Sequence, residues 1–352
     1  MLAFANNAHT QRWANSLSEA GCEIHLAYLP EHAPTLHRLG DGVVQHELAG
    51  HGQLAYFTQA PAVRRLWRRV RPDVTHAHYA SGYGTTLRLA RLRPSVLSAW
   101  GSDVYEFPDR GRIQRALIRA NLGYPDVVTS SSHVMAARIA EVTSGRVHAP
   151  VIPFGVDLGR FFPSPDPTRE GPVRFGVVKT LEPHYRIDVI VRAFSDYLHR
   201  SGAPAATLDI YGSGPLLGEL TTLRETLQLG DLVRFHGAIA HEAVPAAVRD
   251  LDVFLLASET ESFGVAAVEA MACGVPVIAS DAPGFVEVLD GGRFGLLYPR
   301  GDVRALADLM YELATVKERR QEVAAAGVAG AQRYDWSANV AAMRELLASV
   351  AR

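Results

Sequence analysis

Short apolar runs alternate with segments of helical periodicity along the whole chain, and no other feature restricts the fold as strongly. The runs have the length and residue types of buried strands. Strands that alternate with helices form parallel sheets wrapped by helices, so we predict an α/β chain with two doubly wound sheets. The candidate strands are 2–5, 23–29, 74–78, 95–99 and 127–129 in the first half, and 173–178, 207–211, 232–235, 253–256 and 276–279 in the second.

The length of 352 residues also favours two domains, because a single hydrophobic core stops growing efficiently near about 250 to 300 residues. The segment 151–157, followed by prolines at 163, 165 and 167, indicates a linker, since proline and glycine interrupt regular structure. We predict a first domain over 1–155 and a second over 156–334. The last segment, 335–352, has the periodicity of a helix and is expected to pack back on the first domain.

Composition and cysteine content exclude several classes of protein. The chain has 48% hydrophobic and 20% charged residues, which is typical of a soluble globular protein. Cys22 and Cys273 are its only cysteines and lie far apart, so neither a disulfide framework nor a cysteine metal cluster is expected. No apolar run approaches the roughly 18 to 20 residues of a spanning helix, and the first residues lack a signal-peptide pattern. We therefore expect a cytoplasmic protein.

The net charge of −2 is unevenly distributed between the two halves. Residues 1–157 contain 16 Arg, no Lys and 12 acidic residues, a balance of +4, which leaves 19 basic and 25 acidic residues, or −6, for the remainder. Segment 63–71 predicts a helix with arginines on one face. A solvated helix face is the simpler interpretation, and peripheral contact with anionic lipid at the inner membrane, or with a phosphorylated acceptor, stays open. A nucleic-acid partner is not expected at a pI near 6.7.

The most informative stretch is E-S-F-G-V-A-A-V-E at 261–269, directly after a predicted strand. We predict a helix over 263–273, which places the backbone N–H groups of 262–264 at a helix N-terminus, where phosphate binds well. Glu261 precedes this helix, and Glu269 lies two turns into it. Two carboxylates beside an anion site suit a nucleotide sugar. Taken alone, either one would more simply be a solvated side chain.

Nearly the whole chain resembles the retaining glycosyltransferases of family four, which have the GT-B fold of two Rossmann-like domains facing a central cleft. The resemblance rests on the E-x7-E pattern of Glu261 and Glu269 and on I-P-F-G-V-D at 152–157. It implies that Glu261 contacts donor sugar hydroxyls, that the amides of Ser262, Phe263 and Gly264 bind phosphate, and that Glu269 binds the ribose.

A second predicted donor element is the loop after strand 173–178. Lys179 is one of only two lysines among 35 basic residues, and at a strand end it suggests a point charge that reaches a phosphate. A solvated surface lysine is the alternative. The resemblance implies a basic pair in this loop that stabilises the departing diphosphate. Whether His184 or Arg186 supplies the second member stays open.

Two glycine turns complete the predicted donor site. Gly212 and Gly214 resemble the family's G-x-G-P turn, and the segment Phe235, His236 and Gly237 resembles the one that lines the nucleobase. A dinucleotide-binding fingerprint would need a third glycine where Leu217 stands, which argues against a dehydrogenase. Asp250 and Asp252 precede a strand, at the wrong end for a ligand, so we expect no metal and no cofactor besides the nucleotide sugar.

The first domain should supply the acceptor site from the ends of its strands. A single histidine is more often structural, but several at one edge favour a site. Many relatives carry a histidine where Trp100 stands. The candidates are Asn7, His9, Thr10, His78, Trp100, Asp103 and His133, and Asp103 is also a candidate catalytic residue with Lys179 and Glu261.

The predicted reaction is a metal-independent hexosyl transfer from a UDP- or GDP-linked sugar to a hydroxyl of a glycan, lipid-linked or small-molecule acceptor, as in polysaccharide or lipid-linked glycan synthesis. The resemblance implies retention of configuration. The leaving phosphate can accept the acceptor's proton, which agrees with the absence of a G-x-S-x-G elbow. Two alternatives are a catalytically silent nucleotide-sugar-binding subunit and a nucleotide-sugar epimerase of the same architecture.

Overall fold

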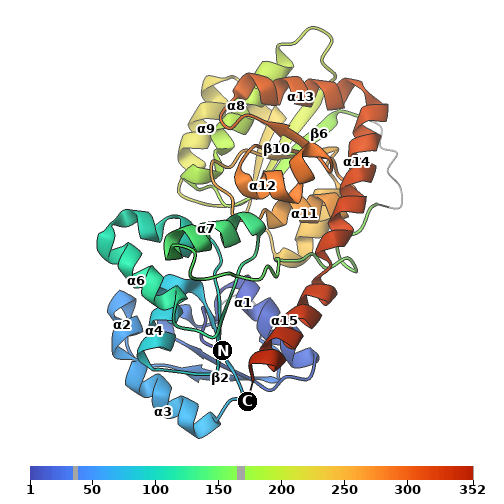
Figure 1. The fold of residues 1–352 in the computed structure, drawn as a ribbon. Coiled ribbons are helices and arrows are strands. Elements are labelled where there is room, and N and C mark those ends of the chain that lie inside the picture. Colours follow the sequence, from blue (N-terminus) through green and yellow to red (C-terminus); the bar gives the residue numbers. More distant parts are fainter. Residues whose placement is uncertain (35–38, 165–170, 352) are drawn as a thin grey trace. The chain divides into compact units, whose positions relative to one another are not determined.

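The chain folds into two compact units (Figure 1). The computed structural model describes residues 1–34, 39–164 and 171–351. The first unit comprises Met1–Pro153 with Ser337–Arg352, and the second comprises Phe154–Trp336. The division falls near the predicted boundary after residue 155, and the C-terminal helix belongs to the first unit. Residues 165–170 of the predicted second domain and Arg352 of the predicted helix lie outside the described residues.

The first unit contains parallel strands in two groups, β1 with β2 and β3 with β4 and β5. Isolated bridges from Leu2 to Ala27 and Ala77 join the groups. A strand was predicted over 2–5, but only these bridges form there, because the chain turns to begin a helix that Asn7 caps. The strands are β1 (Ile24–Tyr28), β2 (Val43–Glu47), β3 (Thr75–His78), β4 (Ser95–Ser98) and β5 (Val127–Thr129).

Helices and short turns connect these strands, and a buried apolar core lies among them. In α3, Arg64 donates to the carbonyl of Ala90, whereas Arg65, Arg68 and Arg69 are exposed. The helical elements are α1 (Ala8–Glu19), η1 (Pro30–His32), α2 (Gly52–Thr58), α3 (Ala60–Val70), the π-helix η2 (Tyr79–Tyr83), α4 (Gly84–Leu89), α5 (Ser102–Tyr105), η3 (Phe107–Arg110), α6 (Arg112–Leu122), α7 (His133–Thr143) and α15 (Trp336–Val350).

The second unit contains a six-stranded parallel sheet in the order β11-β10-β9-β6-β7-β8. The chain leaves β6 toward β7 and leaves β9 in the opposite direction, toward β10. Such a reversal between neighbouring strands opens a crevice at their carboxyl ends, where ligands bind in doubly wound folds. The strands are β6 (Val173–Val178), β7 (Ala206–Tyr211), β8 (Val233–Gly237), β9 (Val253–Leu256), β10 (Val277–Ser280) and β11 (Leu296–Tyr298).

The core of the second unit lies between β6, β7, β9 and the helices α8, α9 and α13, while α11 packs against α14 and against β9 and β10 (Figure 1). No helix in the described parts of the chain is long and apolar enough to cross a membrane. The helices are α8 (Ile187–Leu198), α9 (Leu217–Thr226), α10 (Val244–Arg249), α11 (Val265–Ala272), α12 (Pro283–Val288), α13 (Val303–Thr315) and α14 (Lys317–Ala331), with short turns η4 (Pro183–Tyr185), η5 (Gly230–Leu232), η6 (His241–Ala243), η7 (Asp290–Gly292) and η8 (Gln332–Tyr334).

Candidate functional site

The loops that follow β6 and β9 bring two predicted residues together. Lys179 directly follows β6, and its Nζ lies 2.9 Å from Oε2 of Glu261, in the loop after β9. The two side chains are only 15% and 12% exposed. The ring of Tyr185 covers the ammonium group, with its centre 4.3 Å from Nζ. Lys179 is therefore a shielded, fixed charge rather than a solvated surface lysine.

The surroundings of Lys179 keep it protonated. Burial by itself would lower the pKa of this lysine, but the carboxylate of Glu261, with a further contribution from Glu269, raises the pKa above its usual value. A nearby negative charge stabilises the charged form of a lysine. The side chain of Lys179 therefore stays positively charged at the carboxyl ends of β6 and β9, where the direction of the chain connections reverses.

The two candidates for a second cation have other partners. The guanidinium of Arg186 forms ion pairs with Asp188 and Glu259. The ring of His184 lies 4.0 Å from that of Tyr185, and its carbonyl accepts the N–H of Glu259. The residue of this loop that contacts the ammonium group of Lys179 is therefore the aromatic Tyr185 rather than His184 or Arg186.

The loop before α11 differs in detail from the prediction. The helix was predicted from residue 263 but begins at Val265, because Gly264 adopts φ 100° and stands outside it as the N-cap. The ring of Phe263 is buried and packs against Tyr334, so only its backbone can face a ligand. Among the described residues, no hydrogen-bond acceptor contacts the N–H of Phe263 or Gly264. Two amides are thus available beside Glu261.

Gly284, in α12, keeps this loop accessible. A Cβ atom at position 284 would lie 2.6 Å from the carbonyl oxygen of Glu261 and 2.8 Å from the nitrogen of Phe263. Both neighbours are backbone atoms that cannot move aside. A side chain at this position would therefore displace the loop that carries Glu261 and the two amides.

The predicted donor-binding glycines Gly212 and Gly214 have a structural explanation. A Cβ atom at Gly212 would lie 1.9 Å from the carbonyl oxygen of Lys179, and one at Gly214 would lie 2.6 Å from that of Leu181. The loop after β7 thus packs directly on the backbone of the Lys179 loop. The two glycines set the position of Lys179 through this close approach.

The segment at the end of β8 carries a hydrogen-bonded histidine. His236 Nε2 lies 2.7 Å from Oδ1 of the buried Asp209, and its ring stacks on Tyr211 with centres 4.3 Å apart. Gly237, with φ 73°, accepts the N–H of Gly212, while the preceding Phe235 lies partly buried against the core. The ring of His236 is therefore held in place beside the Gly212 turn.

Asp250 and Asp252 lie at the opposite, amino-terminal ends of the strands, as predicted. Asp252 accepts the backbone N–H of Arg174, and Asp250 pairs with the guanidinium of that residue. Among the described residues, no group of three or more His, Cys, Asp or Glu side chains is arranged to hold a metal ion.

In the first unit, two of the predicted acceptor residues support local structure. Asn7 caps α1, because its Oδ1 accepts the N–H groups of His9 and Thr10. Asp103 is fully buried, and its carboxylate accepts three N–H groups, from Ala80, Trp100 and Gly101. Burial raises the pKa of Asp103, although these amides oppose the shift. The carboxylate ties the loop after β3 to the loop after β4, which is a positioning role.

Four other predicted residues meet at this edge. The ring of His78 lies 4.5 Å from that of Trp100, and its Nδ1 lies 3.5 Å from Oγ1 of Thr10. The ring of His9 lies edge-on to that of Trp100, with ring centres 6.0 Å apart. Burial and the neighbouring His76 hold the pKa of His78 well below its usual value, so its imidazole is neutral. The last candidate, His133, is exposed at the first position of α7.

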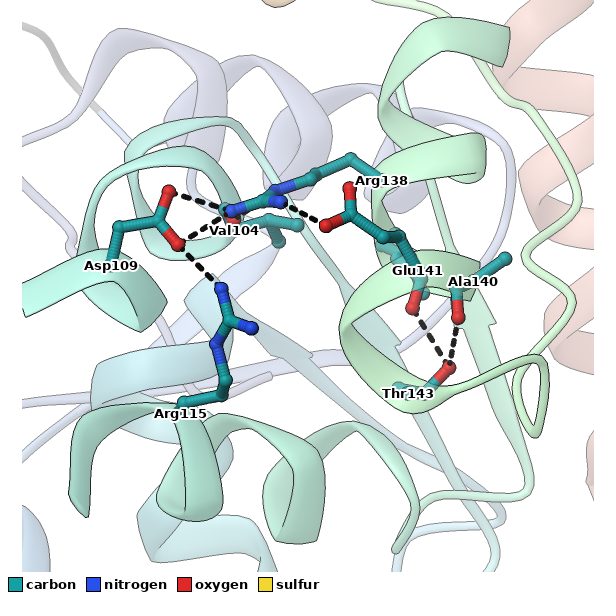
Figure 2. A network of polar contacts seen from close by, with 8 residues as sticks. Val104, Asp109, Arg115, Arg138, Ala140, Glu141 and Thr143 are labelled. Carbon is teal, nitrogen blue, oxygen red and sulfur yellow. Dashed lines mark hydrogen bonds and ion pairs between the residues drawn. The ribbon is translucent and has the colours of Figure 1, made fainter. Parts of the chain in front are cut away.

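An exposed ionic network braces the segment that follows Asp103 (Figure 2). Asp109 of η3 accepts hydrogen bonds from Arg115 of α6 and Arg138 of α7. Arg138 also pairs with Glu141 and donates to the carbonyl of Val104. Both arginines hold the pKa of Asp109 below its usual value, with the hydrogen bond from Arg115 as the largest cause. The loop after β4 is thus fastened to two helices.

Comparisons with known proteins decide the family. Residues 162–328 match the family described as Glycosyl transferases group 1, and residues 1–132 match Glycosyl transferase 4-like. The chain is 30% identical over 285 residues to the GDP-mannose-dependent alpha-(1-6)-phosphatidylinositol monomannoside mannosyltransferase of Mycolicibacterium smegmatis, covering 75% of this chain and 72% of the relative. The chain belongs to the group 1 glycosyltransferases.

Solved structures confirm the GT-B fold of this glycosyltransferase. The sucrose-phosphate synthase of Thermosynechococcus elongatus superposes with a TM-score of 0.85 at 21% identity, over 98% of this chain and 97% of the other. HepE of Anabaena, in complex with UDP, has a TM-score of 0.81 at 18% identity, over 99% and 98% of the two chains. The two Rossmann-like parallel sheets were predicted.

Sequence reasoning missed four residues of this glycosyltransferase that support its candidate donor site. Tyr185 lies between His184 and Arg186, the two candidates for the second cation, and Gly284 lies beyond the E-x7-E segment. Asp209 and Tyr211 occupy alternate positions of β7, where no sequence signal marks them as partners of His236. Gly284, Asp209 and Tyr211 act through contacts between segments that are distant in sequence, whereas Tyr185 contacts Lys179 within one loop.

Proposed function

We propose that this glycosyltransferase moves a sugar, with retention of configuration, from a UDP- or GDP-linked donor to a hydroxyl acceptor in polysaccharide or lipid-linked glycan synthesis. The observation that carries the proposal is the shielded Lys179–Glu261 pair beside the available amides of Phe263 and Gly264. The names of two similar proteins support the donor class, since one relative is GDP-mannose-dependent and HepE is in complex with UDP.

The proposed binding mode exchanges partners within the pair. The diphosphate accepts hydrogen bonds from the two amides and forms an ion pair with Lys179, which leaves Glu261. The carboxylate of Glu261 then accepts hydrogen bonds from the sugar hydroxyls. Glu269 binds the ribose from α11, and the segment around His236 lines the nucleobase. The carboxylate that pairs with Lys179 in the structure is thus the one proposed to bind the sugar.

The proposed chemistry uses the donor's own phosphate as the base. The bond from the anomeric carbon to the phosphate oxygen breaks, and its electron pair stays on that oxygen. The acceptor oxygen bonds to the anomeric carbon on the same face, and its proton passes to the phosphate. Lys179 and the amides stabilise the negative charge that develops on the diphosphate, the kind of preorganised electrostatic contact that dominates many catalysed reactions.

Metal independence is part of the proposal. Lys179 and the helix amides supply the positive potential that a divalent cation would otherwise provide. The acidic pair Asp250 and Asp252 is engaged with Arg174 at the amino-terminal ends of the strands. Neither carboxylate lies at the edge that carries Lys179.

A peripheral membrane contact through the first unit is also proposed. Arg65, Arg68 and Arg69 are exposed on α3, and Leu54 and Phe57 are 75% and 44% exposed on the preceding helix α2. Exposed apolar side chains beside arginines suit an anionic lipid surface. Flotation with vesicles of phosphatidylcholine, with and without phosphatidylglycerol, tests this contact. Binding that does not depend on phosphatidylglycerol, or that survives in the triple Arg→Gln variant, would contradict it.

The decisive experiment separates transfer from binding. A thermal-shift panel of UDP- and GDP-linked sugars identifies the donor, because a ligand at 100 times its dissociation constant adds about 2.7 kcal/mol to the stability. Release of free nucleoside diphosphate is then measured with and without a panel of acceptors. Acceptor-dependent release is expected. A donor that binds but is never turned over would favour the silent binding subunit, and isomerisation of the donor would favour an epimerase.

A further inference from the structure

Three aromatic rings meet at the carboxyl edge of the first unit, outside the predicted acceptor residues. The ring of Phe4 lies edge-on to that of His32, with centres 4.3 Å apart, and edge-on to that of Tyr79, with centres 5.2 Å apart, while it also packs against the buried Tyr83. The three residues follow the bridge at Leu2, strand β1 and strand β3 respectively. All three residues are partly buried, so each keeps some surface exposed to solvent. This cluster of Phe4, His32 and Tyr79 is called the aromatic platform below.

The hydrogen bonds around His32 determine where its proton lies. The hydroxyl of the buried Tyr83 accepts the N–H of Leu29 at 2.8 Å and lies 2.9 Å from Nδ1 of His32. Its single proton is therefore donated to Nδ1. Burial lowers the pKa of His32, although Glu31 opposes the shift, so the imidazole is neutral and carries its proton on Nε2. Within the described part of the chain, Nε2 has no hydrogen-bond partner.

Tyr79 adopts a backbone conformation that a side chain disfavours. Its φ is 75°, in the left-handed region, and it begins the π-helix η2. Its hydroxyl contacts Ser102, and Asp103 accepts the N–H of the next residue, Ala80. The surrounding contacts thus hold a tyrosine where glycine would fit more easily. Backbone strain of this kind clusters at functional sites, and π-helical turns are frequent there.

We propose that the aromatic platform binds the ring of a cyclic polyol, a pyranose or a cyclitol, as part of the acceptor. The inference rests on the proposed function and names the acceptor class. The apolar face of such a ring packs on aromatic side chains, and its hydroxyls accept the Nε2–H of His32. The platform lies beyond the carboxyl ends of parallel strands, where doubly wound folds bind ligands. Asp103 accepts N–H groups from both the loop after β3, which carries Tyr79, and the loop after β4, which carries Trp100, and so connects the two residues.

The chain offers a matched set of variants for the test. Tyr79→Gly removes the ring and relieves the positive φ, so the backbone does not oppose the change. Tyr79→Phe keeps the ring and loses only the contact with Ser102. Phe4→Leu removes the ring of a second platform residue but keeps an apolar side chain at that position. Phe162→Ala removes an exposed aromatic ring of the second unit, outside the platform.

Binding is measured by saturation-transfer NMR with methyl α-D-mannopyranoside and with myo-inositol, and folding by thermal unfolding. We expect the wild type, Tyr79→Phe and Phe162→Ala to bind at least one probe, and Tyr79→Gly and Phe4→Leu to bind it at least fivefold more weakly. Wild type that binds neither probe, or folded Tyr79→Gly and Phe4→Leu that bind as wild type does, would overturn the platform. Calorimetric binding of UDP and GDP is measured in parallel, because its absence in the wild type would count against the proposed donor site instead.

Discussion

The two units present chemically different edges at the carboxyl ends of their strands. The edge of the second unit holds opposite charges, Lys179 and Glu261, 2.9 Å apart. The edge of the first unit holds neutral imidazoles and aromatic rings, and burial lowers the pKa of both His32 and His78. A departing diphosphate gains negative charge, whereas a hydroxyl acceptor stays neutral until it reacts. The difference therefore matches the parts that the two substrates play in the proposed transfer.

The largest expected effect comes from removing the cation of the second unit. Lys179→Ala should lower kcat by about 10² to 10³, because the charge that Lys179 meets grows as the bond to phosphate breaks. Lys179→Arg should restore part of the activity, since a planar guanidinium keeps the charge but not the geometry. Steady-state release of nucleoside diphosphate checks both variants, with circular dichroism as the folding control. A folded Lys179→Ala enzyme with near-normal kcat would leave the amides of the α11 loop as the main phosphate contact.

The neutral edge should depend on one buried carboxylate. Asp103→Ala leaves three backbone N–H groups without their acceptor, so the free energy of unfolding should fall by about 2 to 4 kcal/mol. The control is Asp109→Ala, which removes the ion pairs of Asp109 with Arg115 and Arg138 in Figure 2 and should cost less, because ion pairs at the surface contribute little. Urea unfolding measures both variants. Equal losses would mean that the loops are not held by Asp103.

Glu269 should act on donor affinity rather than on the chemical step. It lies on α11, and in the proposed mode it binds the ribose equally in the ground and transition states. Glu269→Ala should therefore raise the KM for the donor about tenfold with little change in kcat. Initial rates at varied donor concentration separate the two constants. An unchanged KM in the folded variant would remove Glu269 from the donor site.

A smaller effect is expected from the ring over Lys179. Tyr185→Leu should lower kcat by about threefold to tenfold, because a cation–π contact of this kind contributes about 1 kcal/mol. Tyr185→Phe keeps the ring and should behave almost as the wild type, while donor KM changes little in either variant. This pattern distinguishes a positioning residue from a general loss of stability. Equal kcat values for the Leu and Phe variants would show that the ring does not position Lys179.

Removal of metal ions is expected to have no effect on the rate of transfer. Thorough chelation with EDTA should leave the rate of transfer unchanged, since the proposed stabilisation of the diphosphate uses only Lys179 and backbone amides. The assay is the same release of nucleoside diphosphate after dialysis against EDTA. Loss of turnover that magnesium or manganese restores would contradict the metal-free mechanism and direct attention to Asp250 and Asp252.

The sequence allowed the charged edge to be predicted better than the neutral one. Glu261 and Glu269 lie in one segment with a fixed spacing, and Lys179 directly follows the long apolar strand β6, so local patterns were sufficient. The aromatic platform escaped notice because Phe4, His32 and Tyr79 come from three segments and meet only through tertiary packing. Their residue types carry no spacing signal.

The fold shows the same limit. The buried strands β6 and β9 were predicted with their observed bounds, because both are continuous apolar runs. The edge strand β2 was missed, since most of its residues are exposed and polar, and so was the short edge strand β11. The start of α11 was misplaced by two residues, because the left-handed conformation of Gly264 depends on the packing of its loop.

The pairing of Lys179 with Glu261 also affects how fast a donor can arrive. Opposite charges 2.9 Å apart form a dipole, whose field falls off with distance more steeply than that of a single charge. The pair therefore exerts little long-range attraction on an approaching dianion, and the lysine acts only after contact, when the diphosphate replaces the carboxylate. Association that is not steered at long range depends little on ionic strength. This pair favours a donor encounter rate that stays nearly constant as the salt concentration of the surroundings changes.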